Sequence, residues 1–360
     1  MTGPVALPEA WEAGRDRELP GALTALLPGA PRRLSRLGGG RNSAVYLAEC
    51  GARGTFVVKA YAPPGPGGRD RLEVECAALR FLEAASPPED PAPAPRLVAA
   101  CPQAHLAVHA YRPGTAVTAP DARDVDLALA FVARLRALSG HPLARALPPA
   151  AEAAFDPAAL GATLARRFEA LAAVADDAPQ TRAMRRFLDD ELRPLAQAAL
   201  ARAATAFPAS GPLPQSERVL SPSDFGFHNA RRTPDGGLVF LDFEYFGWDD
   251  PAKLGADFLL HPAMGLTPAL GRRFARGLCA RFGPSLAGRL AALGPVYAVK
   301  WCLILLNEFT AQGLARRRLS GCRQDRAAVL RAQLTKAGRL AALARSDHVA
   351  RCLDDGPDRP

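Results

Sequence analysis

The stretch "SPSDFGFHNARRTPDGGLVFLDFEYFGWDDP", Ser221 to Pro251, carries the densest set of polar motifs in this 360-residue chain. It begins as a loop in which an acid, Asp224, is followed five positions later by an amide, Asn229. A glycine-containing turn then leads to the apolar run "LVFL", which ends at a second acid, Asp242. Asp and Asn favour turns in all proteins, so each residue alone predicts only a turn. Whether these residues form a functional site therefore depends on the motifs in the rest of the chain.

The first part of the chain, up to about Val108, has the pattern of strands and turns. "RRLSRLGGGRNSAVYLAEC" and "GTFVVKAYAP" alternate or run apolar and are punctuated by glycine, which is typical of an antiparallel sheet. One helix is expected in "DRLEVECAALRFLEAA", whose apolar residues recur at helical spacing, and the proline-rich "SPPEDPAPAP" ends it. A small sheet-rich lobe with one main helix is predicted.

Helical patterns dominate after Pro113-Gly114, with one strand-and-turn island from Val219 to Phe246. The predicted fold class is α+β with two lobes. The first lobe covers residues 1–108, including an N-terminal extension over residues 1–33. A connector at 109–114 leads to a helical lobe at 115–360, which carries the loops at 221–229 and 241–251.

The small lobe contains a glycine-rich turn and one lysine in an apolar strand. Gly38, Gly39 and Gly40 precede Arg41-Asn42-Ser43, and glycine lets a backbone turn sharply and present N–H groups to phosphate oxygens. By itself this is the pattern of an ordinary hairpin. Lys59 follows in "FVVKAY", where its charge is costly unless it is paired. Glu75 in the next helix is the expected partner, although a solvated acid on the helix face is the alternative.

These motifs resemble the aminoglycoside phosphotransferase and choline kinase family, which are small-molecule kinases with a protein-kinase-like fold. The resemblance runs from about Leu37 to about Leu260 and is most specific from Asp224 to Pro251. The family's loop has an aspartate and, five positions later, an asparagine. "LDFE" is similar to its second metal-binding motif, and "DDP" at 249–251 takes the place of its Gly-Asp-Pro turn. "HLAVHAYRPG" is similar to the apolar run that precedes the family's connector.

The resemblance implies a phosphotransferase that uses ATP and Mg²⁺ to phosphorylate a hydroxyl group of a small molecule. Asp224 would be the catalytic residue, and Asn229 and Asp242 would bind the metal. The implied nucleotide-binding residues are Gly38, Gly39, Gly40, Asn42, Ser43, Lys59, Glu75, His109, Ala110 and Tyr111.

The chain departs from the family pattern at Pro222, because the family usually has histidine two residues before the catalytic aspartate. Proline fixes φ and is able to stiffen the loop in place of that histidine. The alternative is a kinase-like module that binds a nucleotide or a partner with little or no catalysis. Retention of the lysine, both aspartates and the asparagine favours the enzyme.

The charge distribution bears on the acceptor. The chain has a net charge of +9, and its segment from Arg272 to Arg351 is rich in arginine, with only Glu308, Asp325 and Asp347 as acids. This segment disfavours a polycationic aminoglycoside and favours a sugar or a related neutral or anionic metabolite; an aminoglycoside or an amino alcohol is the alternative. Aromatic residues could stack on a sugar ring: Tyr245, Phe246, Trp248 and Trp301.

The sequence also predicts the surroundings of the protein. Seven scattered cysteines without metal-ligand spacing indicate reduced thiols. The apolar run "WCLILL" is too short to span a bilayer, and no signal peptide is recognised at the N-terminus, so a cytoplasmic protein is expected. No membrane or nucleic-acid partner is expected, since the arginine excess fits a compositional bias and no recognition motif accompanies it. The oligomeric state stays open.

Overall fold

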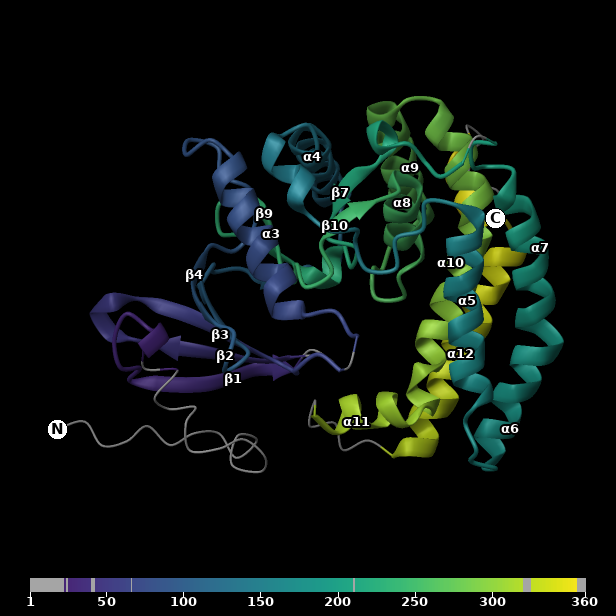
Figure 1. Ribbon diagram of the computed structural model, residues 1–360, viewed down its shortest axis with the longest axis horizontal. Helices are drawn as coiled ribbons and strands as arrows, with labels where there is room; N and C mark the ends of the chain where they lie inside the picture. The colour runs from purple at the N-terminus through teal and green to yellow at the C-terminus, as the bar shows by residue number, and fades with distance from the viewer. Residues whose placement is uncertain are drawn as a thin grey trace.

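The structure is a computed structural model that describes Leu23 and residues 25–39, 43–65, 67–209, 211–319 and 325–354. Gly40 and Asn42 of the predicted nucleotide site lie outside the described residues. The small sheet lobe and the larger helical lobe are distinct in Figure 1, with the sheet at the lower left and the helices above and to the right. The predicted two-lobed α+β organisation is confirmed.

The small lobe is one antiparallel sheet in the order β1-β2-β3-β5-β4, packed against helix α3 (Arg71–Ala85). Its strands are β1 (Arg33–Gly39), β2 (Ser43–Glu49), β3 (Thr55–Tyr61), β4 (Leu97–Cys101) and β5 (Leu106–Ala110). Asp70 caps α3 by accepting a hydrogen bond from the N–H of Glu73. The predicted sheet with one main helix is therefore confirmed.

The two faces of this sheet have different neighbours because side chains alternate along each strand. Phe56 and Val58 of β3 face an apolar cluster with Leu23 and Leu27. Tyr61, on the opposite face, packs with Leu72 and other residues of α3. Lys59 shares this second face, so the lysine points toward α3.

Strand β5 continues farther than the sequence predicted. His109 and Ala110 lie in β5, paired with β3, and the side chain of His109 is buried. The predicted connector began at His109, whereas the strand continues to Ala110. The local sequence has no breaker before Pro113 that would mark the earlier end.

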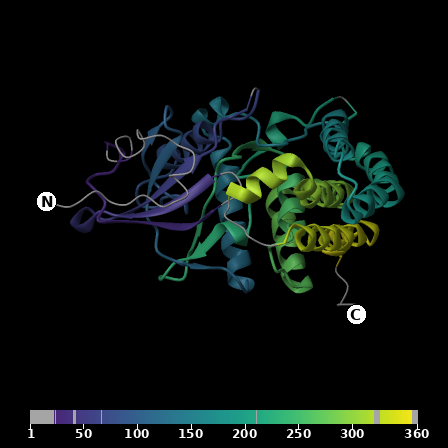
Figure 2. The same cartoon turned by 90° about the horizontal axis from the view of Figure 1, so that it is seen from below.

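The helical lobe follows β6 (Thr115–Ala116). Its helices are α4 (Ala122–Leu138), α5 (Pro157–Ala172), α6 (Pro179–Arg186), α7 (Arg193–Ala204), α8 (Pro251–Leu260), α9 (Pro268–Phe282), α10 (Ser285–Leu306), α11 (Ala311–Leu319), α12 (Arg326–Arg345) and α13 (His348–Arg351). Figures 1 and 2 agree that α11 projects from the other helices toward the small lobe.

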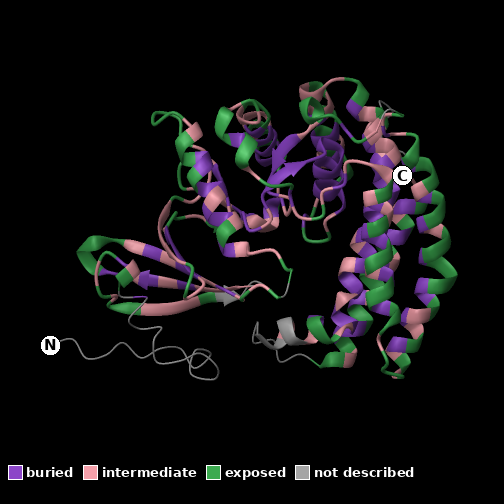
Figure 3. Ribbon diagram, viewed as in Figure 1, coloured by how far each residue is buried: buried purple, intermediate pink, exposed green. Residues whose placement is uncertain are grey.

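Helix α10 forms the centre of the helical lobe. The segment Ser285–Phe309 is long and apolar enough to cross a membrane, but 78% of its most apolar window is buried inside the protein. It packs against α5, α7, α8 and α12, and Figure 3 shows buried residues along its length. These contacts are those of a core helix.

Two short strand pairs hold the loops of the opening stretch. Strand β7 (Val219–Ser221) pairs with β10 (Gly247–Asp249), and β8 (Ala230–Arg232) pairs with β9 (Leu238–Phe240). The loop after β7 contains Asp224, and the loop after β9 contains Asp242. The N–H of Leu241 donates to the carbonyl oxygen of Asn229 over 2.7 Å. This hydrogen bond fixes the two loops side by side.

Candidate active site

Lys59 is one of the residues that join the two lobes. Its Nζ lies 2.6 Å from Glu75 Oε2 on α3 and 2.5 Å from Asp242 Oδ1 in the helical lobe. Glu244 Oε2 is 3.4 Å away. Burial alone would lower the pKa of Lys59, but the carboxylates of Asp242 and Glu75 outweigh burial and raise the pKa well above its usual value. The lysine is thus a fixed positive charge inside the cleft.

Glu75 connects α3 to Lys59 and to the loop after β9. Its Oε2 accepts hydrogen bonds from Lys59 Nζ and from the hydroxyl of Tyr61, both over 2.6 Å. Its Oε1 accepts from the N–H of Phe243 over 3.4 Å. The predicted pairing of Lys59 with Glu75 is confirmed, and the alternative of a solvated acid on the helix face is wrong because Glu75 is 1% exposed.

Asp242 has a strained backbone and a perturbed carboxyl group. Its φ of 66° lies in the left-handed region, which is unfavourable for a residue with a Cβ. Burial raises the pKa of Asp242 to about 7, with Glu244 and Glu75 adding to the shift and Lys59 opposing it. Strained residues and shifted pKa values concentrate at functional sites, and Asp242 combines both.

The donor set around Asp242 fits a hard divalent cation. Carboxylate oxygens of Glu75, Asp242 and Glu244 lie within 4.8 Å of one another. In the loop after β7, Asn229 Nδ2 donates a hydrogen bond to the backbone oxygen of Asp224. Among the described residues, no hydrogen bond to Asn229 Oδ1 is found, so this oxygen is available to a metal. Carboxylate and amide oxygens are the ligands that Mg²⁺ prefers. The residues present therefore fit Mg²⁺.

The loop that carries Asp224 begins with a tight turn. The N–H of Asp224 donates to the carbonyl oxygen of Pro222 over 2.9 Å, and the intervening Ser223 has a φ of 67°. His228 Nε2 lies 3.0 Å from Asp224 Oδ1. Burial alone would raise the pKa of Asp224, but the hydrogen bond and the electrostatic attraction of His228, together with nearby His261, lower the pKa to about 2. The carboxylate is ionised at neutral pH.

Apolar anchors hold this loop against the core. Phe225 and Phe227 are buried, and their rings contact those of Phe240 and Phe258. Between them, a Cβ on Gly226 would lie 2.4 Å from the sulfur of Met264 and 2.9 Å from the His228 ring. A side chain at this position therefore fits only if Met264 and the His228 ring move. The loop is therefore rigid on one side and presents Asp224 on the other.

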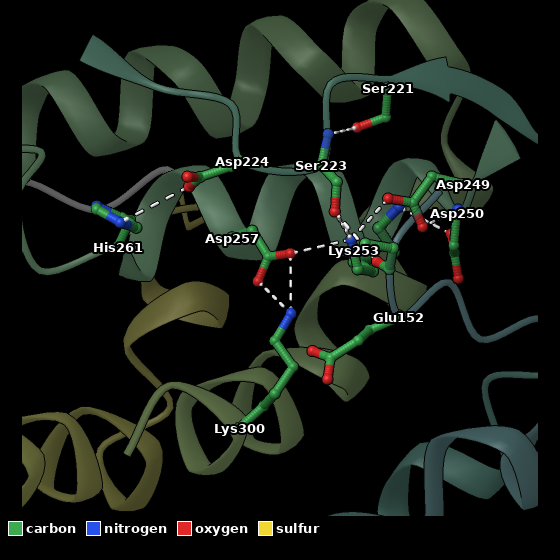
Figure 4. Close-up of polar contacts among 12 residues, drawn as sticks. Glu152, Ser221, Ser223, Asp224, Asp249, Asp250, Lys253, Asp257, His261 and Lys300 are labelled. Atoms are coloured by element: carbon green, nitrogen blue, oxygen red, sulfur yellow. Dashed lines mark hydrogen bonds and ion pairs between the residues drawn. The ribbon is translucent and has the colours of Figure 1, made fainter. Parts of the chain in front are cut away.

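A buried network of charges supports the same loop (Figure 4). Lys253 Nζ on α8 donates to Ser223 Oγ over 2.9 Å and to Asp249 Oδ2 over 2.7 Å. Asp257 on the same helix accepts from Lys300 over 2.8 Å and from the indole N–H of Trp301 over 2.9 Å. Two lysines and two aspartates thus balance their charges inside the lobe.

The two loops open onto one cavity of about 630 Å³, which helices α8, α10 and α12 also line. Its polar lining from the loops includes Ser223, Asp224, Asn229 and Asp242. Its helical lining includes Lys300, Trp301, Asn307, Glu308, Gln333 and Lys336. Asp224, Asn229 and Asp242, which are separated by up to 18 positions in the chain, therefore face the same space.

The remaining residues predicted from the sequence belong to the nucleotide site and to the aromatic candidates. Gly38 and Gly39 end β1, and Ser43 begins β2 opposite Tyr61. His109 is buried beside Glu75, since each influences the pKa of the other. Tyr111 is 40% exposed just after β5. Of the aromatic candidates, Tyr245 and Trp301 line the cavity, whereas Phe246 is buried in the core and Trp248 lines a different cavity.

Four residues around the candidate site were not identified from the sequence: Tyr61, Glu244, Lys253 and His261. One signal was available. The chain has only four lysines (Lys59, Lys253, Lys300 and Lys336), and all of them line the cavity, support its loops or pair with Asp242.

Solved structures that superpose on this chain include small-molecule phosphotransferases. Spectinomycin phosphotransferase in complex with ADP and spectinomycin superposes with a TM-score of 0.62 at 11% identity, over 92% of this chain and 99% of that one. Choline kinase from Streptococcus pneumoniae gives 0.56 at 15% identity, over 90% and 97%. Ethanolamine kinase from Plasmodium vivax gives 0.56 at 14% identity, over 87% of each chain. At these identities the likeness establishes the fold.

The sequence comparisons are more specific about the family. No curated protein sequence matches the chain at a significant level. The sequence profile of the phosphotransferase enzyme family matches residues 33–293, which include β1, Lys59, both loops and the first part of α10. Because this match covers well over half of the chain and the fold agrees with it, the chain belongs to the phosphotransferase enzyme family.

Proposed function

We propose that this protein transfers the γ-phosphate of ATP, with Mg²⁺, to a hydroxyl group of a small molecule in the cytoplasm. The observation that carries the proposal is the convergence of Asp224, Asn229 and Asp242 on one cavity, next to the pair formed by Lys59 and Glu75. Phosphoryl transfer depends on positioning and charge neutralisation more than on covalent chemistry, and this set of groups supplies both.

Each residue has a role that follows from its surroundings. Asp224 is ionised and hydrogen-bonded by His228, so its carboxylate is able to orient the acceptor hydroxyl and to receive its proton. Lys59, with the hairpin of β1 and β2, would hold the phosphates of the nucleotide. Asn229 and Asp242 would hold Mg²⁺, with Glu244 beside Asp242. When bound, the metal neutralises phosphate charge.

The cavity lining favours a neutral or anionic acceptor, such as a sugar derivative. Its three acids outside the two loops are already paired: Glu152 with Arg167, Asp257 with Lys300, and Glu308 with Arg317. By contrast, Lys336 has no ion pair among the described residues, and Gln333 is 7% exposed with an Oε1 that lacks a donor there. A hydroxyl of the acceptor would satisfy Gln333.

An aminoglycoside or an amino alcohol is the second candidate, because solved relatives of this fold bind spectinomycin or are named choline and ethanolamine kinases. A catalytically weak nucleotide-binding module is the third, because Pro222 replaces the family's histidine. The support that Ser223 receives from Lys253 and Ala151 favours a working loop, since it substitutes for the missing side chain.

The experiment is a screen of ATP consumption with Mg²⁺ over sugars, amino alcohols, nucleosides and aminoglycosides. We expect phosphate transfer to at least one hydroxylated compound, abolished by EDTA. An Asp177→Asn variant, altered at an exposed acid distant in sequence from both loops, serves as the control and should match the wild type. Binding of Mg-ATP without transfer to any acceptor would indicate the non-catalytic module, and the absence of both would reject all three candidates.

A further inference from the structure

A second cavity, of about 420 Å³, lies in the helical lobe between the end of α4, the turn Gln215–Glu217 and the start of α10. None of the residues that line it also lines the cavity at Asp224. Its apolar walls are formed by Trp248, Pro251, Phe282 and Leu286. It is therefore a separate pocket, large enough for a small molecule.

The charge around this second cavity is strongly positive. It is lined by Arg136, Arg145, Arg218 and Arg289, and by a single acid, Glu217. Arg289 forms an ion pair with Asp250, whereas the other three arginines have no carboxylate partner among the described residues. Positive charge concentrated in a cleft with apolar walls focuses the field and attracts anions.

Two of these arginines, Arg136 and Arg218, lie against aromatic rings. The guanidinium of Arg136 lies over the ring of Phe282 at 5.0 Å, and that of Arg218 lies over Phe155 at 3.7 Å. Arg218 Nε also donates to the carbonyl oxygen of Leu213 over 2.9 Å. Stacking fixes a guanidinium plane without occupying all its N–H donors, which then suit the paired oxygens of a phosphate group.

The first turn of α10 adds a second favourable field. Ser285 and Leu286 of this 22-residue helix line the cavity, and Pro284 at its N-cap provides no side-chain cap. The N-terminus of a long helix attracts anions through its dipole. The N–H groups of Leu286 and Ala287 already donate to the carbonyl oxygens of Gly283 and Pro284, so the dipole is the contribution of this helix end. The hydroxyl groups of Ser139, Ser216 and Ser285 are further polar groups in the lining.

We propose that this second cavity binds a phosphate-bearing small molecule with two or more negative charges. The site is independent of the reaction at Asp224. It adjoins the elements that hold the catalytic loop, because Ser139 accepts a hydrogen bond from the N–H of Leu220 in β7, and Pro251 begins α8. The aromatic wall offers a surface for an apolar or planar portion of the ligand.

The test is calorimetry of the full chain with inorganic pyrophosphate, without added metal. The variant Arg136→Ala/Arg145→Ala removes two exposed arginines of the cavity. We expect it to bind pyrophosphate at least tenfold more weakly than the wild type. The control, Arg331→Ala/Arg339→Ala, removes the same charge from exposed positions on α12 and should bind as the wild type does.

Three results would overturn the proposal. The first is a wild type that does not bind pyrophosphate at concentrations below roughly 1 mM. The second is a cavity variant that binds as tightly as the wild type, which would locate the anion elsewhere, including the triphosphate region near Lys59. The third is a control that loses as much affinity as the cavity variant, which would show that net charge alone causes the loss. Equal melting temperatures of both variants would show that folding is not the cause.

Discussion

At the scale of single residues, Lys59 has the largest electrostatic role in the cleft because three carboxylates surround its ammonium group. We expect Lys59→Met to weaken ATP binding at least tenfold. It should also lower the free energy of unfolding by about 3–5 kcal/mol, because it leaves buried carboxylates without a partner. Calorimetry and urea unfolding measure the two effects.

The matched control for this lysine is Lys336→Met. Lys336 is exposed, lines the acceptor side of the cavity and has no ion pair among the described residues. Its replacement should leave ATP affinity and stability unchanged and raise the KM for an anionic acceptor. Equal ATP affinity of wild type and Lys59→Met would contradict the role of Lys59.

Gly226 tests whether the loop geometry matters for the reaction. An alanine Cβ would press against Met264 and the His228 ring, and His228 is the hydrogen-bond partner of Asp224. We expect Gly226→Ala to cost about 1–3 kcal/mol of stability and to lower kcat at least tenfold. Gly161→Ala is the control, because a Cβ there has open space within helix α5 and should stabilise the protein by about 0.5–1 kcal/mol. Unaltered kcat in Gly226→Ala would show that the loop tolerates displacement.

At the scale of elements, helix α8 supports the loop of Asp224 through a hydrogen bond from Lys253 to Ser223. Ser223→Gly removes the hydroxyl that accepts from Lys253 and donates to the carbonyl oxygen of Ala151, while glycine tolerates the positive φ. We expect kcat to fall about tenfold, with the KM for ATP unchanged and stability within about 1 kcal/mol of the wild type. Steady-state kinetics separates the two constants. A rise in the KM for ATP at constant kcat would contradict a role in positioning Asp224.

The elements themselves could largely be predicted from local patterns. Alternating apolar residues and glycine punctuation predicted the sheet of the small lobe, and helical spacing of Leu72 and Cys76 predicted α3. The end of β5 was placed too early, because the strand's hydrogen bonds with β3 decide it and the local sequence contains no signal there. Pairing across strands and helices, as for Glu244 and Lys253, depends on tertiary contacts that periodicity does not contain.

At the scale of the whole molecule, Asp257 and Lys300 join α8 to α10 beneath the cavity. Lys300→Met should lower the free energy of unfolding by about 3–5 kcal/mol, because it leaves much of the charge of a buried aspartate uncompensated. Adding Asp257→Leu should recover part of this loss. Guanidinium unfolding measures both variants. A loss below about 1 kcal/mol for Lys300→Met would mean that Lys253 alone satisfies Asp257.

The overall charge of the chain predicted the charge of the cavity lining only in part. The segment from Arg272 to Arg351 is basic in sequence, yet the cavity that it helps to form also contains Glu152, Asp257 and Glu308, each paired with a cation. The net charge of a segment does not show which charged residues are paired with one another, whereas a ligand in the cavity interacts mainly with the unpaired groups. The rarity of lysine was the more informative signal, because all four lysines line the cavity, support its loops or pair with Asp242.

The most direct test of the central claim is single-turnover phosphate transfer from ATP by wild type and Asp224→Asn, with an acceptor found by the screen. The substitution keeps the shape of Asp224 and removes its charge, so Mg-ATP affinity should survive. The rate of transfer should fall at least about a hundredfold, or roughly 2.7 kcal/mol of transition-state stabilisation. An unaltered rate of transfer in Asp224→Asn would contradict the assignment of the loop at 221–229 as the catalytic loop.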